Sequence, residues 1–339
     1  MLEQSRNLGR WALIPTLVLV GMLLLASCAD ASTSSRPSGG TTAGAAGGTI
    51  AEFSLPKGGT PEEIVAGPGG NLWFTEKVGN KIGRITPEGT ITEFSLPTSN
   101  SFPEGITAGP DGNLWFIEMA GAVGRITPQG KITEFPLSTS SKPSGGIASG
   151  SDGNLWFTEL TGAVGRITPQ GKITTFPLLT SPSLAEEITP GPDGNLWFTD
   201  RASGNIGHIM PGGNVMEFPL PTRTRLPEGI TAGPGNTLWF TENASNRIGS
   251  ITVQGKISEF PLPTPNSGVT RITQGSDSAL WFTEFASNKI GRITAQGTIS
   301  EFPLPTANAA PRGITSGPSD TLWFTESASN RIGRLTPGG

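Results

Sequence analysis

The 339-residue chain contains no tyrosine and only one cysteine and one histidine. The single cysteine excludes an internal disulfide and every zinc cluster built from several cysteines. The single histidine excludes any site that needs two histidine side chains. Charged residues make up only 15% of the chain, and the net charge of −4 provides no basic field for binding nucleic acid.

Glycine and proline, by contrast, are abundant, at 48 and 30 residues. They are the two weakest helix formers, which argues against a mostly helical protein. The absence of a strict Gly-X-Y period excludes collagen. Eight tryptophans and 16 phenylalanines can fill a core, which argues against disorder. The composition favours a β protein with many turns.

Residues 1–27 have the features of a bacterial lipoprotein signal peptide. Two arginines precede an apolar run, residues 11–26, which is shorter than a membrane-spanning helix. The sequence LASC at residues 25–28 resembles a lipobox, in which the cysteine is lipidated; an ordinary signal peptide or a buried cysteine are the alternatives. Residues 28–48 are rich in glycine, serine and threonine and are expected to form a flexible tether. We therefore expect an exported protein, anchored through lipidated Cys28 to the extracytoplasmic face of a bacterial cell envelope.

A repeat of 41 or 42 residues organises the rest of the chain. Leu-Trp-Phe units place tryptophan at residues 73, 115, 156, 197, 239, 281 and 323. A second unit places phenylalanine at residues 53, 94, 135, 176, 218, 260 and 302. Each repeat contains four short runs of β-branched and aromatic residues separated by Gly/Pro turns. This pattern predicts an all-β, seven-bladed β-propeller with four-stranded blades over residues 49–339.

The repeat is offset by one strand at the two ends. The chain enters on a fourth-strand unit at residues 49–53 and leaves after a third-strand unit at residues 331–335. The N-terminal strand is therefore expected to complete the last blade and close the ring without an unpaired edge. An open solenoid is the alternative, but neither end has the polar cap that a solenoid needs.

The repeated acids and the single histidine invite catalytic roles, but their positions favour structural ones. The acids lie three residues after each repeated tryptophan, at Glu76, Glu118, Glu159, Asp200, Glu242, Glu284 and Glu326. Every blade has one, followed at a constant distance by Gly-Arg-Ile or a variant, so we expect a strand-to-strand ion pair or a turn cap. His208 takes a position that is arginine in five blades and Ser250 in another, which favours a half-exposed strand site.

The strings GITxGPDGxLWFTE, NKIGRIT and EFPLPT closely resemble the repeats of the virginiamycin B lyase (streptogramin lyase) family, over residues 49–336. The resemblance implies a seven-bladed propeller. It also implies a carbon–oxygen lyase that uses Mg²⁺ and opens a cyclic depsipeptide antibiotic by elimination across its ester linkage, without water.

The resemblance also implies where the catalytic histidines lie, in a Pro-His-x-Ile pattern at the start of the innermost strand in the last two blades. The matching residues here are Thr270 and Arg312, and the family's accompanying acid falls on Ala310. Glu326 is a further candidate acid. The family's reaction needs a general base and a cation that stabilises the enolate. With threonine and arginine at the two histidine positions, the sequence predicts a family member without the family's catalytic histidines.

The position of these two residues recurs in every blade. We call the seven residues the ring residues: Glu62, Glu104, Gly145, Glu186, Glu228, Thr270 and Arg312. Innermost strands line the central channel of a propeller, so the ring residues are expected at one mouth of it. With their neighbours Glu63, Glu187 and Arg271 they would form a funnel with an acidic arc and a basic arc. The ring varies from blade to blade, as binding sites do.

We therefore expect a small-molecule or peptide ligand at the channel mouth, bound by Glu62, Glu104, Glu186, Glu228, Arg271 and Arg312. A hydrated collar of loops without a ligand is the main alternative. Mg²⁺ or Ca²⁺ held by Glu104 and Glu228 is another, and a clustered carboxylate with a raised pKa could act as a base.

The leading functional hypothesis is a membrane-anchored, monomeric propeller that binds a ligand without catalysis. A lyase with a carboxylate base is the second hypothesis. A scaffold that presents its blade edges to another envelope protein is the third. The expected membrane contact is the lipid anchor alone, and no nucleic-acid partner is expected.

Overall fold

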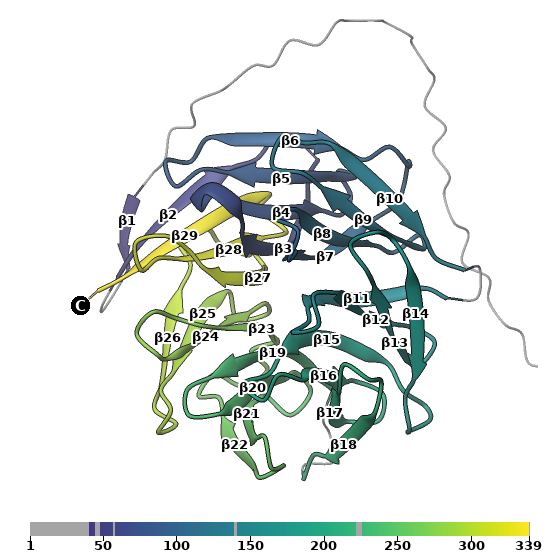
Figure 1. The fold of residues 1–339 in the computed structure, drawn as a ribbon. Coiled ribbons are helices and arrows are strands. Elements are labelled where there is room, and N and C mark those ends of the chain that lie inside the picture. The colour runs from purple at the N-terminus through teal and green to yellow at the C-terminus, as the bar shows by residue number, and fades with distance from the viewer. Residues whose placement is uncertain (1–40, 45–47, 57, 139–140, 222–225, 339) are drawn as a thin grey trace, which may run out of the picture. The chain divides into compact units, whose positions relative to one another are not determined.

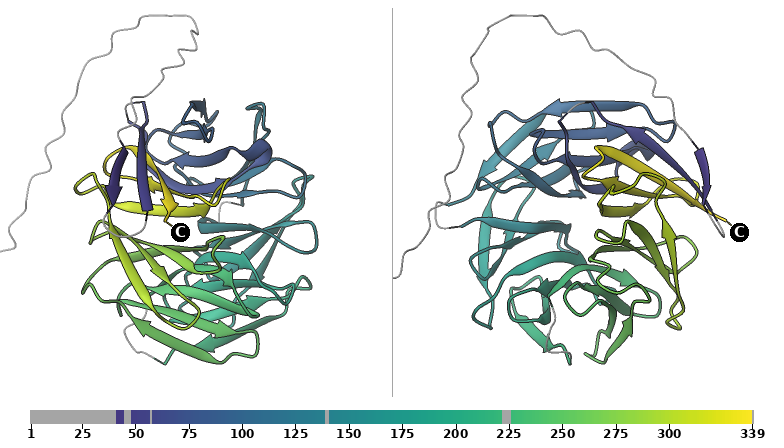
Figure 2. Two further views of the ribbon diagram at one scale, coloured as in Figure 1. Left: turned by 90° about the vertical axis from the view of Figure 1, so that its left-hand side faces the viewer. Right: turned by 180° about the vertical axis from the view of Figure 1, so that it is seen from behind.

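The computed structural model describes residues 41–44, 48–56, 58–138, 141–221 and 226–338. These residues form seven antiparallel sheets arranged in a ring, with the first strand of each blade nearest the centre (Figure 1). Figure 2 shows the same ring from the side and from behind. The predicted all-β, seven-bladed β-propeller with four-stranded blades is confirmed.

Each of the first six blades contains four consecutive strands. Blades one to three comprise β3 (Pro61–Ala66), β4 (Leu72–Glu76), β5 (Lys81–Ile85), β6 (Ile91–Ser95), β7 (Pro103–Ala108), β8 (Leu114–Glu118), β9 (Ala122–Ile126), β10 (Ile132–Pro136), β11 (Pro143–Ser149), β12 (Leu155–Glu159), β13 (Ala163–Ile167) and β14 (Ile173–Pro177). Blades four to six comprise β15 (Ala185–Pro190), β16 (Leu196–Asp200), β17 (Asn205–Ile209), β18 (Val215–Pro219), β19 (Pro227–Gly233), β20 (Thr237–Glu242), β21 (Arg247–Thr252), β22 (Ile257–Pro261), β23 (Val269–Gln274), β24 (Leu280–Glu284), β25 (Lys289–Ile293) and β26 (Ile299–Pro303). A short 3₁₀ turn, η1 (Pro68–Gly70), lies between β3 and β4.

The seventh blade joins the two ends of the propeller. It combines β27 (Pro311–Ser316), β28 (Leu322–Glu326) and β29 (Arg331–Pro337) with β2 (Gly48–Ser54) from the start of the propeller. β2 pairs antiparallel with β29 and places Phe53 opposite Ile332, as the offset of the repeats predicts.

A further strand, β1 (Thr41–Gly44), pairs with β2 on its outer side. It lies within residues 28–48, so this part of the expected flexible tether is a strand instead. The outer edge of β2 explains the difference, because its main-chain groups are available to pair with another strand. The expected signal peptide and Cys28 lie outside the described residues. Within the described residues, no helix is long and apolar enough to span a membrane.

Tryptophan and phenylalanine fill the core, as predicted. The seven repeated tryptophans are at most 3% exposed, and each stacks on a fourth-strand phenylalanine. In the closing blade, the ring centroids of Trp323 and Phe53 are 5.6 Å apart. The phenylalanine of each Leu-Trp-Phe unit needs a glycine beneath it, since a Cβ on Gly83 would lie 2.1 Å from the ring of Phe74.

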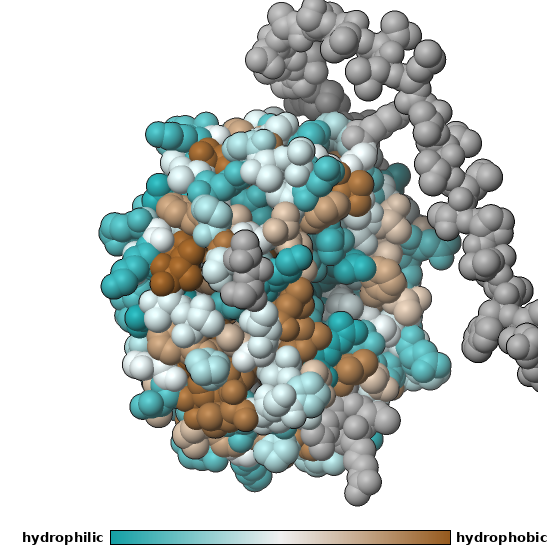
Figure 3. All heavy atoms as spheres, turned by 90° about the vertical axis from the view of Figure 1, so that its right-hand side faces the viewer, coloured by the Kyte–Doolittle hydropathy of each residue, from teal (hydrophilic) through white to brown (hydrophobic). Residues whose placement is uncertain are grey.

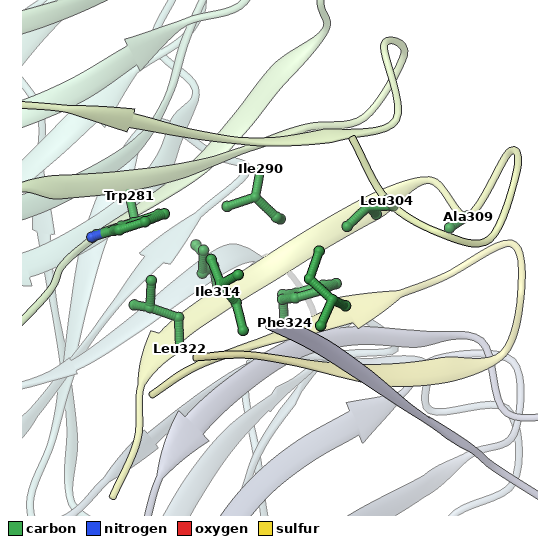
Figure 4. Packing of buried hydrophobic residues seen from close by; sticks show 9 residues of the cluster. Trp281, Ile290, Leu304, Ala309, Ile314, Leu322 and Phe324 are labelled. Carbon is green, nitrogen blue, oxygen red and sulfur yellow. The ribbon is translucent and has the colours of Figure 1, made fainter. Parts of the chain in front are cut away.

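Neighbouring blades pack through these residues. Figure 4 shows the packing between blades six and seven, where Trp281 and Ile290 lie opposite Ile314, Leu322 and Phe324.

On the outer side of the molecule in Figure 3, apolar residues form separate areas among hydrophilic ones.

Asparagine turns link the second and third strands of several blades. Asn80, Asn246, Asn288 and Asn330 have φ between 55° and 60°, a left-handed conformation that asparagine tolerates. The amide of Asn246 donates to the carbonyl of Thr264 (2.9 Å) and accepts the N–H of Ser267 (2.8 Å). Each such turn therefore holds the loop that leads to the next blade's innermost strand.

Candidate functional site

A threonine in the second strand positions the ring residues. The hydroxyl of Thr199 accepts the N–H of Glu187 in its own blade (3.1 Å) and donates to the carbonyl of Glu228 in the next (2.6 Å). Five other threonines make the same two bonds: Thr75, Thr158, Thr241, Thr283 and Thr325. Isoleucine 117 takes the place in blade two. These hydrogen bonds link the starts of the innermost strands around the channel at every blade junction except that between blades two and three.

A cavity of about 330 Å³ lies at this mouth. All six residues predicted to bind a ligand line it, together with Glu63, Arg201, Asn243, Thr270 and Phe285. Five carboxylates and three guanidinium groups face the cavity, so its lining carries a formal excess of two negative charges. The sequence pattern therefore located residues that the fold brings together.

A second set of residues surrounds the ring. We call the residues that directly follow the repeated acids the rim residues: Lys77, Met119, Leu160, Arg201, Asn243, Phe285 and Ser327. Lys77 reaches Glu104 of the next blade (Nζ to Oε2, 3.2 Å), and Arg201 reaches Glu228 (Nη2 to Oε1, 3.4 Å). The guanidinium carbon of Arg312 lies over the ring of Phe285, 4.9 Å from the ring centroid.

The rim residues were not among the residues predicted from the sequence. They vary from blade to blade just as the ring residues do. This variation, directly after an acid that every blade has, could have indicated a binding position.

Arg271 closes the floor of the cavity. Its Nε lies 2.7 Å from Oε2 of Glu63 and 3.2 Å from Oε2 of Glu187. Burial raises the pKa of Glu187 to about 8, against the opposing effect of Arg271. Below this triad, a second cavity of about 180 Å³ is lined mainly by isoleucines 64, 106, 188, 230, 272 and 314. The triad therefore separates a polar mouth from an apolar lumen.

The charges do not separate into the expected acidic and basic arcs. Arg312 lies 3.1 Å from Glu62 (Nη1 to Oε2), and Arg271 lies between carboxylates from blades one and four. Burial raises the pKa of Glu62, which Arg312 opposes, and burial likewise raises the pKa of Glu228. Ion pairing across blades mixes the two signs.

The positions expected for catalytic histidines lie in the cavity. Thr270 shares a hydrogen bond with Thr283 (2.8 Å), and Arg312 is the partner of Glu62. Glu326 is elsewhere: it is fully buried, accepts a hydrogen bond from Ser329 (2.7 Å), and is not part of the cavity lining. Burial raises its pKa to about 7.

Several of the repeated acids act as turn caps. Ser245 and Ser329 each donate to the acid three residues before them, at 2.7 Å. The expected strand-to-strand ion pairs involve fourth-strand acids instead, as when Lys289 binds Glu301 (2.7 Å). The side chain of Lys289, on the third strand, is long enough to reach this acid on the outermost strand, where the ion pair lies closer to water.

His208 packs in the core, outside the cavity. It lies on β17 and packs edge-on against the stacked rings of Trp197 and Phe218, with ring centroids 4.9 and 5.9 Å away. Burial lowers its pKa, which the nearby Asp193 opposes. The expected half-exposed site is wrong, since His208 is only 5% exposed. Its shorter side chain stays inside, where arginines in other blades extend outward, as when Arg84 donates to the carbonyl of Pro128 (3.1 Å).

The carboxylates expected to bind a metal ion are paired with cations in this structure. Within the described residues, no group of three or more His, Cys, Asp or Glu side chains is placed to hold one. Glu104 and Glu228, the expected ligands, each already lie beside a cation. The Mg²⁺ or Ca²⁺ site stays a prediction, which the metal content of the purified protein would test.

Comparison with known proteins identifies the family. The model of the virginiamycin B lyase family matches residues 41–183 and 138–339. The chain belongs to this family. No sequence among the curated proteins matches it.

Solved structures of virginiamycin B lyase family members are similar throughout the propeller. A streptogramin B lyase is 38% identical, with a TM-score of 0.83, covering 88% of this chain and 100% of that one. Selenomethionine-substituted virginiamycin B lyase from Staphylococcus aureus is 41% identical, with a TM-score of 0.80, covering 85% and 98%. A catalytically inactive histidine-to-alanine variant of the Staphylococcus aureus virginiamycin B lyase, with quinupristin, is 40% identical, with a TM-score of 0.81 and the same coverage.

Proposed function

We propose that this protein binds a small-molecule or peptide ligand in the mouth cavity and does not catalyse the family's elimination. The observation that carries the proposal is the cavity itself. Its lining is rich in charged side chains that cross-blade contacts hold in place, and it includes Thr270 and Arg312, the positions at which the family resemblance implies histidines.

The chemistry of these two residues supports binding over catalysis. A threonine hydroxyl is a poor base at neutral pH, and a guanidinium group has no acceptor atom that could take up a proton. The solved relative that lacks one histidine is catalytically inactive. The only histidine of this chain is buried beside Trp197, outside the cavity.

The sequence further supports an envelope location. We extend the proposal to export and lipid anchoring through Cys28, on the lipobox-like LASC sequence. In bacterial cells, a Cys28→Ser variant is expected to leave the membrane fraction.

Isothermal titration calorimetry tests binding, with quinupristin and a linear lysine-containing peptide as probes. At least one probe is expected to bind the wild type, and the Glu104→Ala/Glu228→Ala double variant is expected to lose that binding. The exposed Glu88→Gln variant is the matched control. Binding that the double variant leaves unchanged, or no binding of either probe, would contradict the proposal.

A lyase with a carboxylate base is the second candidate. The raised pKa values of Glu62 and Glu228, which follow mainly from burial, favour it. Such an enzyme would remove the proton next to the ester-bearing carbon and break its C–O bond. In that case the wild type would open the ring of quinupristin, and the Glu62→Gln or the Glu228→Gln variant would lack this activity.

A further inference from the structure

The contacts between rim and ring residues follow one register around the mouth. In blades one, four and six, the rim residue contacts the ring residue of the next blade whose carbonyl accepts a hydrogen bond from the threonine two positions before it. Thr75 bonds to Glu104 and Lys77 pairs with it; Thr199 bonds to Glu228 and Arg201 pairs with it. In both cases the rim supplies the cation for the ring carboxylate.

The ring residue of blade four breaks this complementarity. Thr158 bonds to the carbonyl of Glu186 (3.0 Å), which puts Leu160 at the position that Lys77 and Arg201 hold elsewhere. Leucine supplies no cation, and the structure shows no hydrogen bond or ion pair to the Glu186 carboxylate from any described residue. Glu186 nevertheless lines the cavity.

A glycine and an exposed leucine hold the positions around Glu186 in the register of the mouth. The preceding ring position is Gly145, where a Cβ would lie 3.5 Å from Oε1 of Glu186 and 3.9 Å from Nη2 of Arg271, both ordinary contacts. Leu160 is 44% exposed although it is a large apolar side chain. Glu186 thus makes no hydrogen bond or ion pair among the described residues, and the charge of Arg271 acts on it at longer range. The exposed Leu160 holds the matching rim position, and the cavity has an excess of negative charge.

We propose that Glu186 and Leu160 form a subsite for an organic cation, an ammonium or guanidinium group on an aliphatic stem such as a basic amino-acid side chain. Glu186 binds the charged group, and Leu160 packs against the stem. The ligand's cation completes the pairing that Lys77 and Arg201 provide internally in other blades. The proposal rests on ligand binding in the mouth cavity and specifies which ligand group binds where.

The test uses n-pentylamine, which is protonated at neutral pH, and its neutral counterpart 1-pentanol, titrated into the full propeller and followed by amide NMR shifts. The wild type is expected to bind the amine and not the alcohol. Leu160→Lys supplies an internal cation and is expected to weaken amine binding at least about 10-fold, as is Glu186→Gln. Leu160→Met, which keeps an apolar side chain, is expected to bind as the wild type does.

Unchanged amine binding in Leu160→Lys and Glu186→Gln, equal binding of the alcohol, or no amine binding to the wild type would each overturn the subsite. The melting temperature of each variant shows that its fold is intact. Amine binding that only the Glu104→Ala/Glu228→Ala variant abolishes would refute the subsite and leave ligand binding in the cavity standing. Quinupristin or peptide binding measured on the same samples reports on the cavity separately.

Discussion

Among single residues, Glu76 stands out because its buried carboxyl has no hydrogen-bond partner among the described residues. It is fully buried, and neither carboxyl oxygen has a hydrogen-bond partner in the described part of the chain. Blades five and seven have a serine three residues after the acid, whereas blade one has Gly79. Burial raises the pKa of Glu76 to about 8, and Glu93 adds to this effect.

The raised pKa of Glu76 predicts a pH-dependent stability. Between about pH 4.5 and pH 8 the folded state holds a proton that the unfolded state releases, so stability falls as the pH rises, by at most about 1.4 kcal/mol per pH unit. Glu76→Gln should remove this part of the slope, as measured by urea unfolding across that range. The exposed Glu88→Gln variant should keep the wild-type slope, and a Glu76→Gln variant that kept it too would contradict the account.

The sequence predicted some of the site residues correctly and others incorrectly. The repeat identified the six ligand-binding candidates, because equivalent positions in a propeller meet at the channel. The repeat did not show that Glu326 lies outside the cavity or that His208 is buried. Each outcome depends on the side of a twisted strand on which the side chain packs.

At the level of elements, the threonines join neighbouring blades at the mouth. Thr199→Val keeps the shape of the side chain but leaves the N–H of Glu187 and the carbonyl of Glu228 without this partner. The expected loss of stability is about 1–3 kcal/mol, from denaturant unfolding. Thr199→Ser, which retains the hydroxyl, should recover most of it. Equal stability of Thr199→Val and the wild type would show that the bonds contribute nothing.

The strands themselves were predictable, since period-2 runs between Gly/Pro turns recur seven times. Strand β1 was not, because its polar residues show no pattern and only the free edge of β2 gives it a partner. The ion pairs across blades were also beyond the sequence, because they join residues that only the ring brings together, such as Arg271 and Glu63.

At the scale of the whole molecule, pairing of β2 with β29 closes the ring. Phe53 in the closing strand is buried and Phe94 in blade one is half-buried, and each is stacked on a tryptophan (5.6 and 5.7 Å) with an arginine nearby. Closure predicts that Phe53→Ala and Phe94→Ala lose similar stability, about 3–5 kcal/mol by denaturant unfolding. A far smaller loss for Phe53→Ala would mean that the ring end frays.

Binding without elimination is the central claim, and one assay tests it most directly. Purified wild-type protein is incubated at high concentration with Mg²⁺ and quinupristin and analysed by liquid chromatography with tandem mass spectrometry, because elimination across the ester changes the fragmentation and retention but not the mass. The account predicts that quinupristin stays cyclic. Accumulation of its linear isomer, in proportion to the protein added, would contradict it.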